Sequence, residues 1–156
     1  MKRELYLFIL WENARKHEKL ILKDLNDNFD VIQTLEVVWD RKTFSKNLSK
    51  FYGTKLPPKC EKEKEVGTGS FLMVLFWDEK PLYVLRRVNS GDNLVNVNVF
   101  DTKEMYRSIY GGHNVHSSNT QEETAHDLEM LLGMDFKSIM EMMQQKNKIS
   151  KFKKVL

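Results

Sequence analysis

Hydrophobic and polar positions alternate along the chain in blocks that predict strands and helices in turn. A continuous apolar run at residues 5–10 predicts a central strand that is buried on both faces. Residues 18–29 carry apolar side chains at helical spacing, and the β-branched stretch at residues 31–39 predicts a second strand. A second amphipathic helix follows, marked by Phe44, Leu48 and Phe51.

The middle of the chain predicts further strands. Residues 53–69 hold a Pro-Pro pair and a mixed charge run, which indicate a loop or an irregular helix. Residues 71–76 form the third strongly apolar strand, and residues 83–88 extend or follow it. Residues 94–100 alternate Val with Asn, a pattern typical of another strand.

The clearest helix signal lies near the end of the chain. Thr120 and Glu123 have the spacing of a capping box, leucines follow at helical spacing, and Gly133 stands where a helix C′ glycine belongs. We expect a helix over 121–132, and Asp135 can cap a further short helix whose methionines pack in the core. The order of elements predicts an α+β sandwich with helices on one face of a mostly antiparallel sheet.

Composition supports a single globular domain. The chain has 156 residues, of which 41% are hydrophobic and 30% charged, with 7 Gly and 3 Pro, and this excludes collagen-like and mostly disordered chains. No apolar stretch approaches the roughly 20 residues that cross a bilayer. The single cysteine, Cys60, suits a reducing compartment, so we expect a cytoplasmic protein without a membrane span.

The charge is mildly basic and concentrated at the end of the chain. A formal net charge of +3 falls short of the footprint of a nucleic-acid-binding protein, so we do not expect nucleic acid as a partner. Residues 146–156 carry five lysines and no acid, which favours a solvated tail over a patch for an anionic partner. We therefore expect one domain over residues 1–145 and a basic tail over residues 146–156.

Candidate chemistry is concentrated between residues 86 and 127. His113 and His116 lie in a polar, glycine-bearing turn directly before the predicted helix, where an imidazole can act as nucleophile or base and helix N–H groups attract phosphate. The alternative is that both histidines only satisfy loop backbone groups. We expect no metal site, because Cys60 is remote and the two histidines lack further ligands. Walker and G-x-S-x-G motifs are absent from the sequence.

The segment after this turn resembles a known family. Residues 116–132, HSSNTQEETAHDLEMLL, resemble the H-G-S-D-S-x-E-S-A-x-x-E-I segment of nucleoside diphosphate kinases, in which the histidine carries the phosphoryl group. The resemblance implies that His116 is the nucleophile and that Ser118 matches the family's serine. It also places Asp127 on the glutamate that orients the catalytic imidazole.

Other segments resemble the same family in the same order. Residues 69–78, GSFLMVLFWD, are similar to its G-P-V-V-A-M-V-W-E strand, and the same register places Arg87 and Lys103 on two phosphate-binding arginines. The Phe-Tyr pair ending at Tyr52 is similar to a His-Tyr pair, which implies that Tyr52 lies near the catalytic histidine. The resemblance covers about residues 5–133 and implies a ferredoxin-like sandwich of the nucleoside diphosphate kinase type.

The chain also departs from the family's pattern. Trp11 stands where the family's K-P-D segment has its phosphate-contacting lysine, and Ser117 replaces the glycine after the histidine. His113 stands at the family's asparagine, with Asn114 one place off, and both are candidates for phosphate binding. If the site has been rebuilt around an aromatic side chain, we expect Trp11 to line the phosphate cleft beside the nucleophile.

Two functions of different classes follow from the resemblance. The first is a phosphotransferase that passes a terminal phosphate through His116, from a nucleoside di- or triphosphate or a related phosphorylated metabolite, with Mg²⁺ on the nucleotide. The second is a catalytically silent nucleotide-binding or protein-interaction module of the same fold, which the change at Trp11 favours. The retained His116, Ser118, Asp127 and Arg87 favour the first. Because family members usually associate through sheet edges, we expect a homo-oligomer, at least a dimer.

Overall fold

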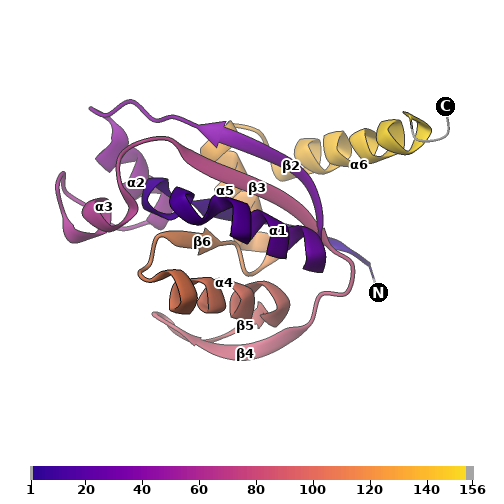
Figure 1. Ribbon diagram of the computed structural model, residues 1–156, viewed down its shortest axis with the longest axis horizontal. Helices are drawn as coiled ribbons and strands as arrows, with labels where there is room; N and C mark the ends of the chain where they lie inside the picture. Colours follow the sequence, from indigo (N-terminus) through magenta and orange to yellow (C-terminus); the bar gives the residue numbers. More distant parts are fainter. Residues whose placement is uncertain (1, 154–156) are drawn as a thin grey trace.

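The computed structural model describes residues 2–153 and the side chains of residues 2–145. Strands and helices are interspersed along the chain, as Figure 1 shows. In chain order the elements are β1 (Glu4–Leu10), η1 (Glu12–His17), α1 (Glu18–Asn28), β2 (Asp30–Val37), α2 (Phe44–Tyr52), α3 (Glu61–Val66), β3 (Phe71–Asp78), β4 (Tyr83–Val88), β5 (Gly91–Asn96), α4 (Val97–Tyr110), β6 (Val115–Ser117), α5 (Gln121–Leu132) and α6 (Phe136–Lys153).

A four-stranded antiparallel sheet, in the order β2-β3-β1-β6, forms the centre of the molecule. The two continuous apolar runs become the inner strands β1 and β3, which pair in register from Glu4 opposite Asp78 to Leu10 opposite Leu72. Almost every residue of both strands is buried, because successive side chains point to opposite faces and both faces are covered. The predicted α+β class with an antiparallel sheet is confirmed.

Helices cover both faces of this sheet, so the prediction of a single covered face is wrong. In Figure 1 α1 lies in front of the sheet and α5 behind it. One core cluster joins Tyr6 and Phe8 of β1 to α1 and α4, and the other joins Leu7 and Ile9 of β1 to α2, α5 and α6. A strand that is apolar on both sides requires cover on both sides, which accounts for the two helical layers.

One predicted strand is half helix. Residues 94–100 alternate Val with Asn, yet β5 ends at Asn96 and the 14-residue helix α4 begins at Val97. Asn96 explains the change, because its side-chain oxygen accepts a hydrogen bond from the backbone N–H of Asn98 (3.1 Å) and so caps the helix. Val99 and Phe100 therefore reach the interior from a helix rather than from a strand.

The hairpin of β4 and β5 forms a second, two-stranded sheet beside α4 (Figure 1). Its base is fastened to the rest of the molecule by hydrogen bonds. The backbone N–H of Val97 donates to the carbonyl of Leu82 (2.9 Å), and the hydroxyl of Tyr83 donates to the Glu4 carboxylate (2.6 Å). Val88 packs on a small apolar cluster that includes Phe100, so the hairpin and α4 share one surface.

The last strand and helix carry the residues of most interest. β6 is only three residues long and pairs with β1, with His116 opposite Ile9. The predicted helix over 121–132 is confirmed as α5. Thr120 caps it by accepting from the N–H of Glu123 (3.1 Å), while the Glu123 carboxylate accepts from the N–H of Asn119 (2.8 Å). The capping box is therefore present, displaced by one residue at its second bond.

The final helix is longer than predicted. The short helix expected after Asp135 is α6, which runs from Phe136 to Lys153 and packs Ile139 and Met143 into the core. Its last residues belong to the segment predicted as a basic tail, so the boundary near residue 145 stays a prediction. In the described part of the chain, none of the helices has the length and apolar character needed to span a bilayer.

Candidate active site

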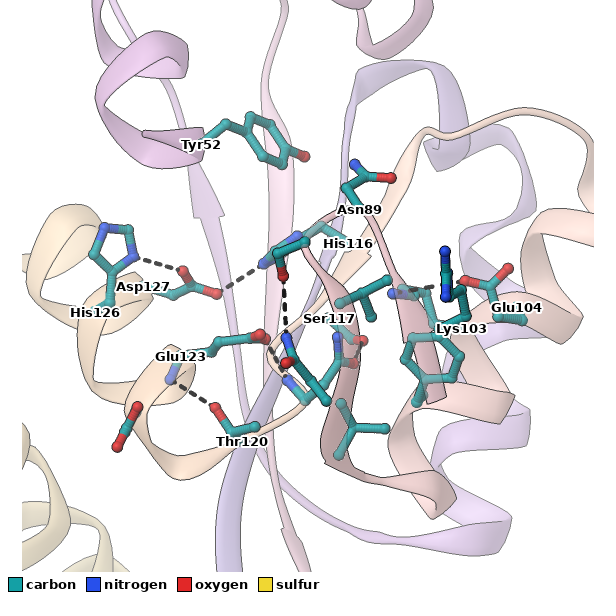
Figure 2. Close-up of a pocket in the computed structure, with 18 of the residues that line it drawn as sticks. Tyr52, Asn89, Lys103, Glu104, His116, Ser117, Thr120, Glu123, His126 and Asp127 are labelled. Carbon is teal, nitrogen blue, oxygen red and sulfur yellow. Dashed lines mark hydrogen bonds and ion pairs between the residues drawn. The ribbon is translucent and has the colours of Figure 1, made fainter. Parts of the chain in front are cut away.

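A pocket of about 850 Å³ opens between α2, the β4–β5 hairpin, α4 and the β6–α5 junction. Figure 2 shows how side chains from these separate elements converge on it. Most of the predicted site residues line this pocket, namely Tyr52, Arg87, Lys103, His113, His116 and Asp127. The other three predicted residues, Trp11, Asn114 and Ser118, are not part of its lining.

His116 is held by a carboxylate from the neighbouring helix. Its Nε2 lies 2.7 Å from Oδ2 of Asp127, whose side chain is only 5% exposed. A carboxylate can only accept a hydrogen bond, so the neutral imidazole carries its proton on Nε2 and a lone pair on Nδ1. Among the described residues, none hydrogen-bonds to that Nδ1. The side chain therefore has the orientation that a nucleophilic imidazole requires.

Aromatic rings from α2 fix the position of the imidazole. Phe51 and Tyr52 both meet the His116 ring edge-on, with centroids 4.9 and 5.7 Å away. The hydroxyl of Tyr52 accepts a hydrogen bond from Nε1 of Trp11 (3.1 Å). Burial raises the pKa of Tyr52 well above its ordinary value, so the phenol stays neutral. Its ring packs against the imidazole and does not act as a base.

Trp11 does not reach the pocket. Its side chain is fully buried and packs against Trp39, Phe51 and Phe71, with the Phe71 centroid 4.7 Å away. The prediction that Trp11 lines the phosphate cleft is therefore wrong. The large ring gains more from burial in this aromatic cluster, and Tyr52 satisfies its single polar atom.

Two cations from α4 line one wall of the pocket. Lys103 is buried, and burial lowers the pKa of its ammonium to about 8, with the positive charge of Arg107 acting in the same direction. Arg107 donates from Nε and Nη2 to the carbonyl of Val115 (3.1 and 2.9 Å), which ties α4 to β6. Sequence reasoning missed Arg107, although its place one helical turn after Lys103 puts both on one face.

Of the two consecutive arginines on the hairpin, only Arg87 is available to a ligand. Arg86 is held by a two-point contact with Asp101 (3.2 and 3.1 Å) and does not line the pocket. Arg87 lines the pocket rim, its side chain is 84% exposed, and its ion pair with Asp92 is long at 3.7 Å. The structure thus brings Arg87, as the sequence predicts, to the same pocket as His116.

The loop that carries His113 is fastened to α3. The backbone N–H of His113 donates to the Glu65 carboxylate (2.5 Å), and Nζ of Lys62 donates to the carbonyl of His113 (3.0 Å). The same ammonium lies 4.9 Å from the centroid of the Tyr52 ring. Asn114 does not line the pocket, and its carbonyl accepts from the N–H of Trp11 (3.1 Å).

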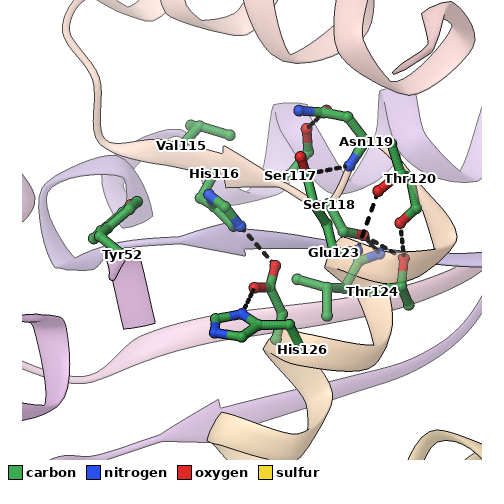
Figure 3. A network of polar contacts seen from close by, with 12 residues as sticks. Tyr52, Val115, His116, Ser117, Ser118, Asn119, Thr120, Glu123, Thr124 and His126 are labelled. Carbon is green, nitrogen blue, oxygen red and sulfur yellow. Dashed lines mark hydrogen bonds and ion pairs between the residues drawn. The ribbon is translucent and has the colours of Figure 1, made fainter. Parts of the chain in front are cut away.

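Ser118 lies beneath the site rather than in it (Figure 3). Its hydroxyl oxygen accepts from the N–H of Leu7 (3.1 Å) and from the hydroxyl of Thr124 (2.8 Å), and the side chain is fully buried. This placement indicates a structural tie between β1 and α5 and does not support the predicted catalytic role of Ser118. Ser117 lines the pocket instead and donates to Asn119 (2.6 Å).

A second histidine contacts the same carboxylate. Nδ1 of His126 lies 3.1 Å from Oδ1 of Asp127, and its half-exposed side chain lines the pocket. Figure 2 shows the resulting row from His126 through Asp127 to His116. Nothing in the sequence pattern pointed to His126, because neighbouring residues on a helix usually diverge and only the bend of the Asp127 side chain brings them together.

Comparison with known proteins identifies the fold. No family model matches the sequence, and no curated protein matches it. Among solved structures, nucleoside diphosphate kinase from Aquifex aeolicus matches with a TM-score of 0.51 at 11% identity, over 83% of this chain and 95% of that chain. The fold is nucleoside diphosphate kinase-like.

Two further solved structures match over similar lengths. Nucleoside diphosphate kinase from Encephalitozoon cuniculi matches with a TM-score of 0.49 and 15% identity, over 86% of this chain and 90% of that chain. A nucleoside diphosphate kinase family protein from Babesia bovis matches with a TM-score of 0.47 and 12% identity, over 83% and 87%. At such identities the likeness concerns the fold alone.

The nucleoside diphosphate kinase-like chain has no metal site of its own in the part that the structure describes. Across the described residues, no group of three or more His, Cys, Asp or Glu side chains is placed to hold an ion. Two carboxylates of the pocket are also engaged, since Asp127 contacts two imidazoles and Glu123 caps α5. These residues do not fit a resident magnesium ion.

Proposed function

We propose that this protein is a phosphotransferase that carries a phosphoryl group on Nδ1 of His116. The observation that supports it most is the hydrogen bond of 2.7 Å between Nε2 of His116 and Asp127, which leaves Nδ1 without a hydrogen-bond partner among the described residues. The imidazole lines a pocket with Arg87, Lys103 and Arg107, which suits an anionic substrate.

The proposed step exchanges one bond to phosphorus for another. The lone pair on Nδ1 of His116 attacks the terminal phosphorus, an N–P bond forms, and the bond from phosphorus to the bridging oxygen breaks. The electron pair of that bond leaves on the departing phosphate oxygen. The proton stays on Nε2, where the Asp127 carboxylate stabilises the positive charge that develops on the ring. An acceptor oxygen then attacks the same phosphorus and returns the pair to Nδ1.

Cations around the pocket would stabilise the charge of the transferring group. Guanidinium groups offer paired donors to phosphate oxygens, whereas a lysine offers a single point charge. Lys103 and Arg107 stand on α4, and Arg87 stands across the pocket on the hairpin. Donors on two sides of the phosphate suit the trigonal charge of a transferring phosphoryl group.

The proposed substrate is a nucleoside di- or triphosphate or a related phosphorylated metabolite. A pocket of about 850 Å³ lies in the range of small-molecule sites, roughly 300 to 1,000 Å³. Magnesium belongs to the proposal only as part of a nucleotide complex, because the described residues build no site for it. The likeness to solved nucleoside diphosphate kinases supports this choice at the level of the fold.

A second function is favoured by the burial of Trp11. The end of β1 supplies no cation to the pocket, since the indole occupies the aromatic core instead. A catalytically silent nucleotide-binding or protein-interaction module would tolerate that loss. The two proposals differ in one property, because only the phosphotransferase forms a covalent bond to His116.

Phosphoryl transfer from labelled nucleoside triphosphate to the protein tests the first function. We expect acid-labile, base-stable label on the wild-type protein and none on the His116→Ala variant. His17→Ala is the matched control, since His17 stacks on Tyr110 away from the pocket, and it should label like the wild type. Nucleotide binding by calorimetry without label above the His116→Ala background would contradict the phosphotransferase and favour the silent module.

We also propose that the protein is a cytoplasmic homo-oligomer. β2 is an edge strand that pairs only with β3 in the described sheet, and such an edge offers backbone groups to a second copy. Light scattering at micromolar concentration should give the mass of a dimer or of a larger assembly. A monomer under these conditions would contradict the proposed assembly without bearing on the fold.

A further inference from the structure

Asp127 is shared between two imidazoles that differ in exposure. Its Oδ2 faces Nε2 of His116 at 2.7 Å, and its Oδ1 faces Nδ1 of His126 at 3.1 Å. The His116 side chain is 17% exposed and that of His126 is 50% exposed. Among the residues whose side chains are described, no third group donates to this carboxylate. The two histidines are therefore the hydrogen-bond partners that orient Asp127 among the described residues.

The sharing fixes the protonation pattern of all three groups. Because the carboxylate accepts at both oxygens, a neutral His116 must donate from Nε2 and a neutral His126 must donate from Nδ1. Each bond holds one oxygen in place, and the rigid planar carboxylate then holds the other. Loss of the His126 bond would let Asp127 rotate, and His116 would lose the constraint that keeps its lone pair on Nδ1.

We infer that His126 is a positioning residue that keeps the nucleophile in its reactive tautomer. It acts through Asp127, donates to Oδ1 and so presents Oδ2 to His116. Besides His116, His126 is the second described side chain that donates to Asp127, and the pocket acid Glu123 is turned back to the helix cap. Phe51 packs against both rings, with centroids 4.9 Å from His116 and 6.3 Å from His126, and limits their movement. The inference rests on the proposed role of His116.

Two variants separate a hydrogen-bond role from a packing role. His126→Ala removes the donor, whereas His126→Asn keeps a nitrogen donor at the δ position and removes the rest of the ring. His17→Asn serves as the matched control, because that histidine contacts Tyr110 and lies outside the pocket. All three variants change a side chain outside the buried core, and melting temperatures confirm that each is folded.

The first measurement needs no nucleotide. Nitrogen-15 shifts of the imidazoles at pH 8, where an ordinary imidazole is neutral, report the tautomer of His116 in the wild type and each variant. We expect Nε2–H for wild-type His116, a mixture with Nδ1–H in His126→Ala, and restoration in His126→Asn. The second measurement is the rate of phosphohistidine formation, which should fall about tenfold in His126→Ala and recover in His126→Asn.

The tautomer of His116 and the uptake of phosphate test the positioning role of His126 and the phosphotransferase separately. An unchanged His116 tautomer in folded His126→Ala would overturn the inference, and so would a failure of His126→Asn to restore it. A tautomer that shifts as expected in a protein that takes up no phosphate would support the positioning role while contradicting the phosphotransferase. A change in His17→Asn as large as that in His126→Ala would also overturn the inference, since the effect would not be specific to the shared carboxylate.

Discussion

Lys103 lines the pocket with a buried charge, and the burial of that charge lowers the stability of the fold. Its ammonium is buried, and burial lowers its pKa to about 8 from an ordinary value of 10.5. The nearest carboxylate, that of Glu104, lies 3.7 Å away and compensates only in part. A depression of that size lowers the free energy of unfolding by about 3 kcal/mol at a pH where Lys103 is charged in both the folded and the unfolded protein. A cation kept under such conditions is expected where an anion binds.

Lys103→Met should raise stability and weaken nucleotide binding. Below pH 8 the lysine is charged in the folded and unfolded states, so the full desolvation cost is present in the wild type. As pH rises from 8 to about 10.5, Lys103 loses its proton in the folded protein before it does so in the unfolded protein. The desolvation cost of the charged ammonium then disappears. We expect a higher melting temperature for the variant at pH 7, by several degrees, and a smaller difference near pH 10.5.

Calorimetry with a nucleoside triphosphate at pH 7 completes this test. The affinity should fall at least tenfold in Lys103→Met, because one positive charge leaves the pocket. Equal melting temperatures at pH 7, or equal affinities, would contradict the assignment of a buried ligand-binding charge to Lys103.

At the residue scale, the family resemblance pointed to several side chains that the structure places in one pocket. His116, Asp127 and Lys103 were matched to the family's motifs by their local segments and register, and all three line the pocket. Trp11 could not be placed, since its choice between pocket and core depends on Trp39 and Phe71, which join it only after folding. The sequence did not point to His126 for a similar reason, because its proposed role depends on a side-chain contact with Asp127 that forms only on folding.

At the scale of elements, the short helix α3 acts as a clamp on the loop before β6. Two of its side chains, Lys62 and Glu65, hold the backbone of His113 from its carbonyl and its N–H. Burial lowers the pKa of Lys62, and Glu65 counters this effect. The clamp fixes the chain shortly before His116, so loss of either contact should loosen one pocket wall.

Lys62→Ala should increase hydrogen exchange in residues 111–114. The matched control is Lys64→Ala in the same helix, since Lys64 is exposed and pairs only with Glu61 at 3.5 Å. Exchange measured by mass spectrometry should rise at least threefold in the first variant and stay unchanged in the second. Equal exchange in both variants would show that α3 does not hold this loop.

Element prediction failed at two places for identifiable reasons. α4 was missed because Val97, Asn98 and Val99 alternate in polarity like a strand, and only the Asn96 cap reveals a helix start. β6 was taken as a turn because three residues carry too little pattern, and its pairing with β1 is a long-range event. The strands β1 and β3 were predicted correctly, since their apolar runs allow no other placement.

At the scale of the whole molecule, the pocket lies where two sheets meet. The main sheet supplies His116 through β6, and the separate hairpin supplies Arg87 and Val88. The backbone joins the hairpin to the main body at its base, where Leu82 and Tyr83 form hydrogen bonds, and Arg86 and Val88 hold it against α4. A ligand in the pocket would therefore contact both the hairpin and the main body, which the backbone connects only at the base of the hairpin.

Nucleotide binding should protect the hairpin from hydrogen exchange. With a saturating magnesium–nucleoside triphosphate complex, exchange in residues 83–96 should fall, because Arg87 and its neighbours then contact the ligand. His116→Ala should show the same protection, as it removes the nucleophile and leaves the hairpin intact. Protection confined to α2 and α3 would contradict a site that includes the hairpin.

The pairing of β6 with β1 also determines when the site can form during folding. His116 lies opposite Ile9, so about 100 residues of chain must be enclosed before His116 reaches its place. Such a long-range contact forms late, after local helices and the hairpin. During synthesis β1 cannot pair with β6 until residues beyond 117 have left the ribosome. Phosphate uptake in a refolding experiment would consequently recover after the bulk of the helical signal, with the site as the final part of the molecule to assemble.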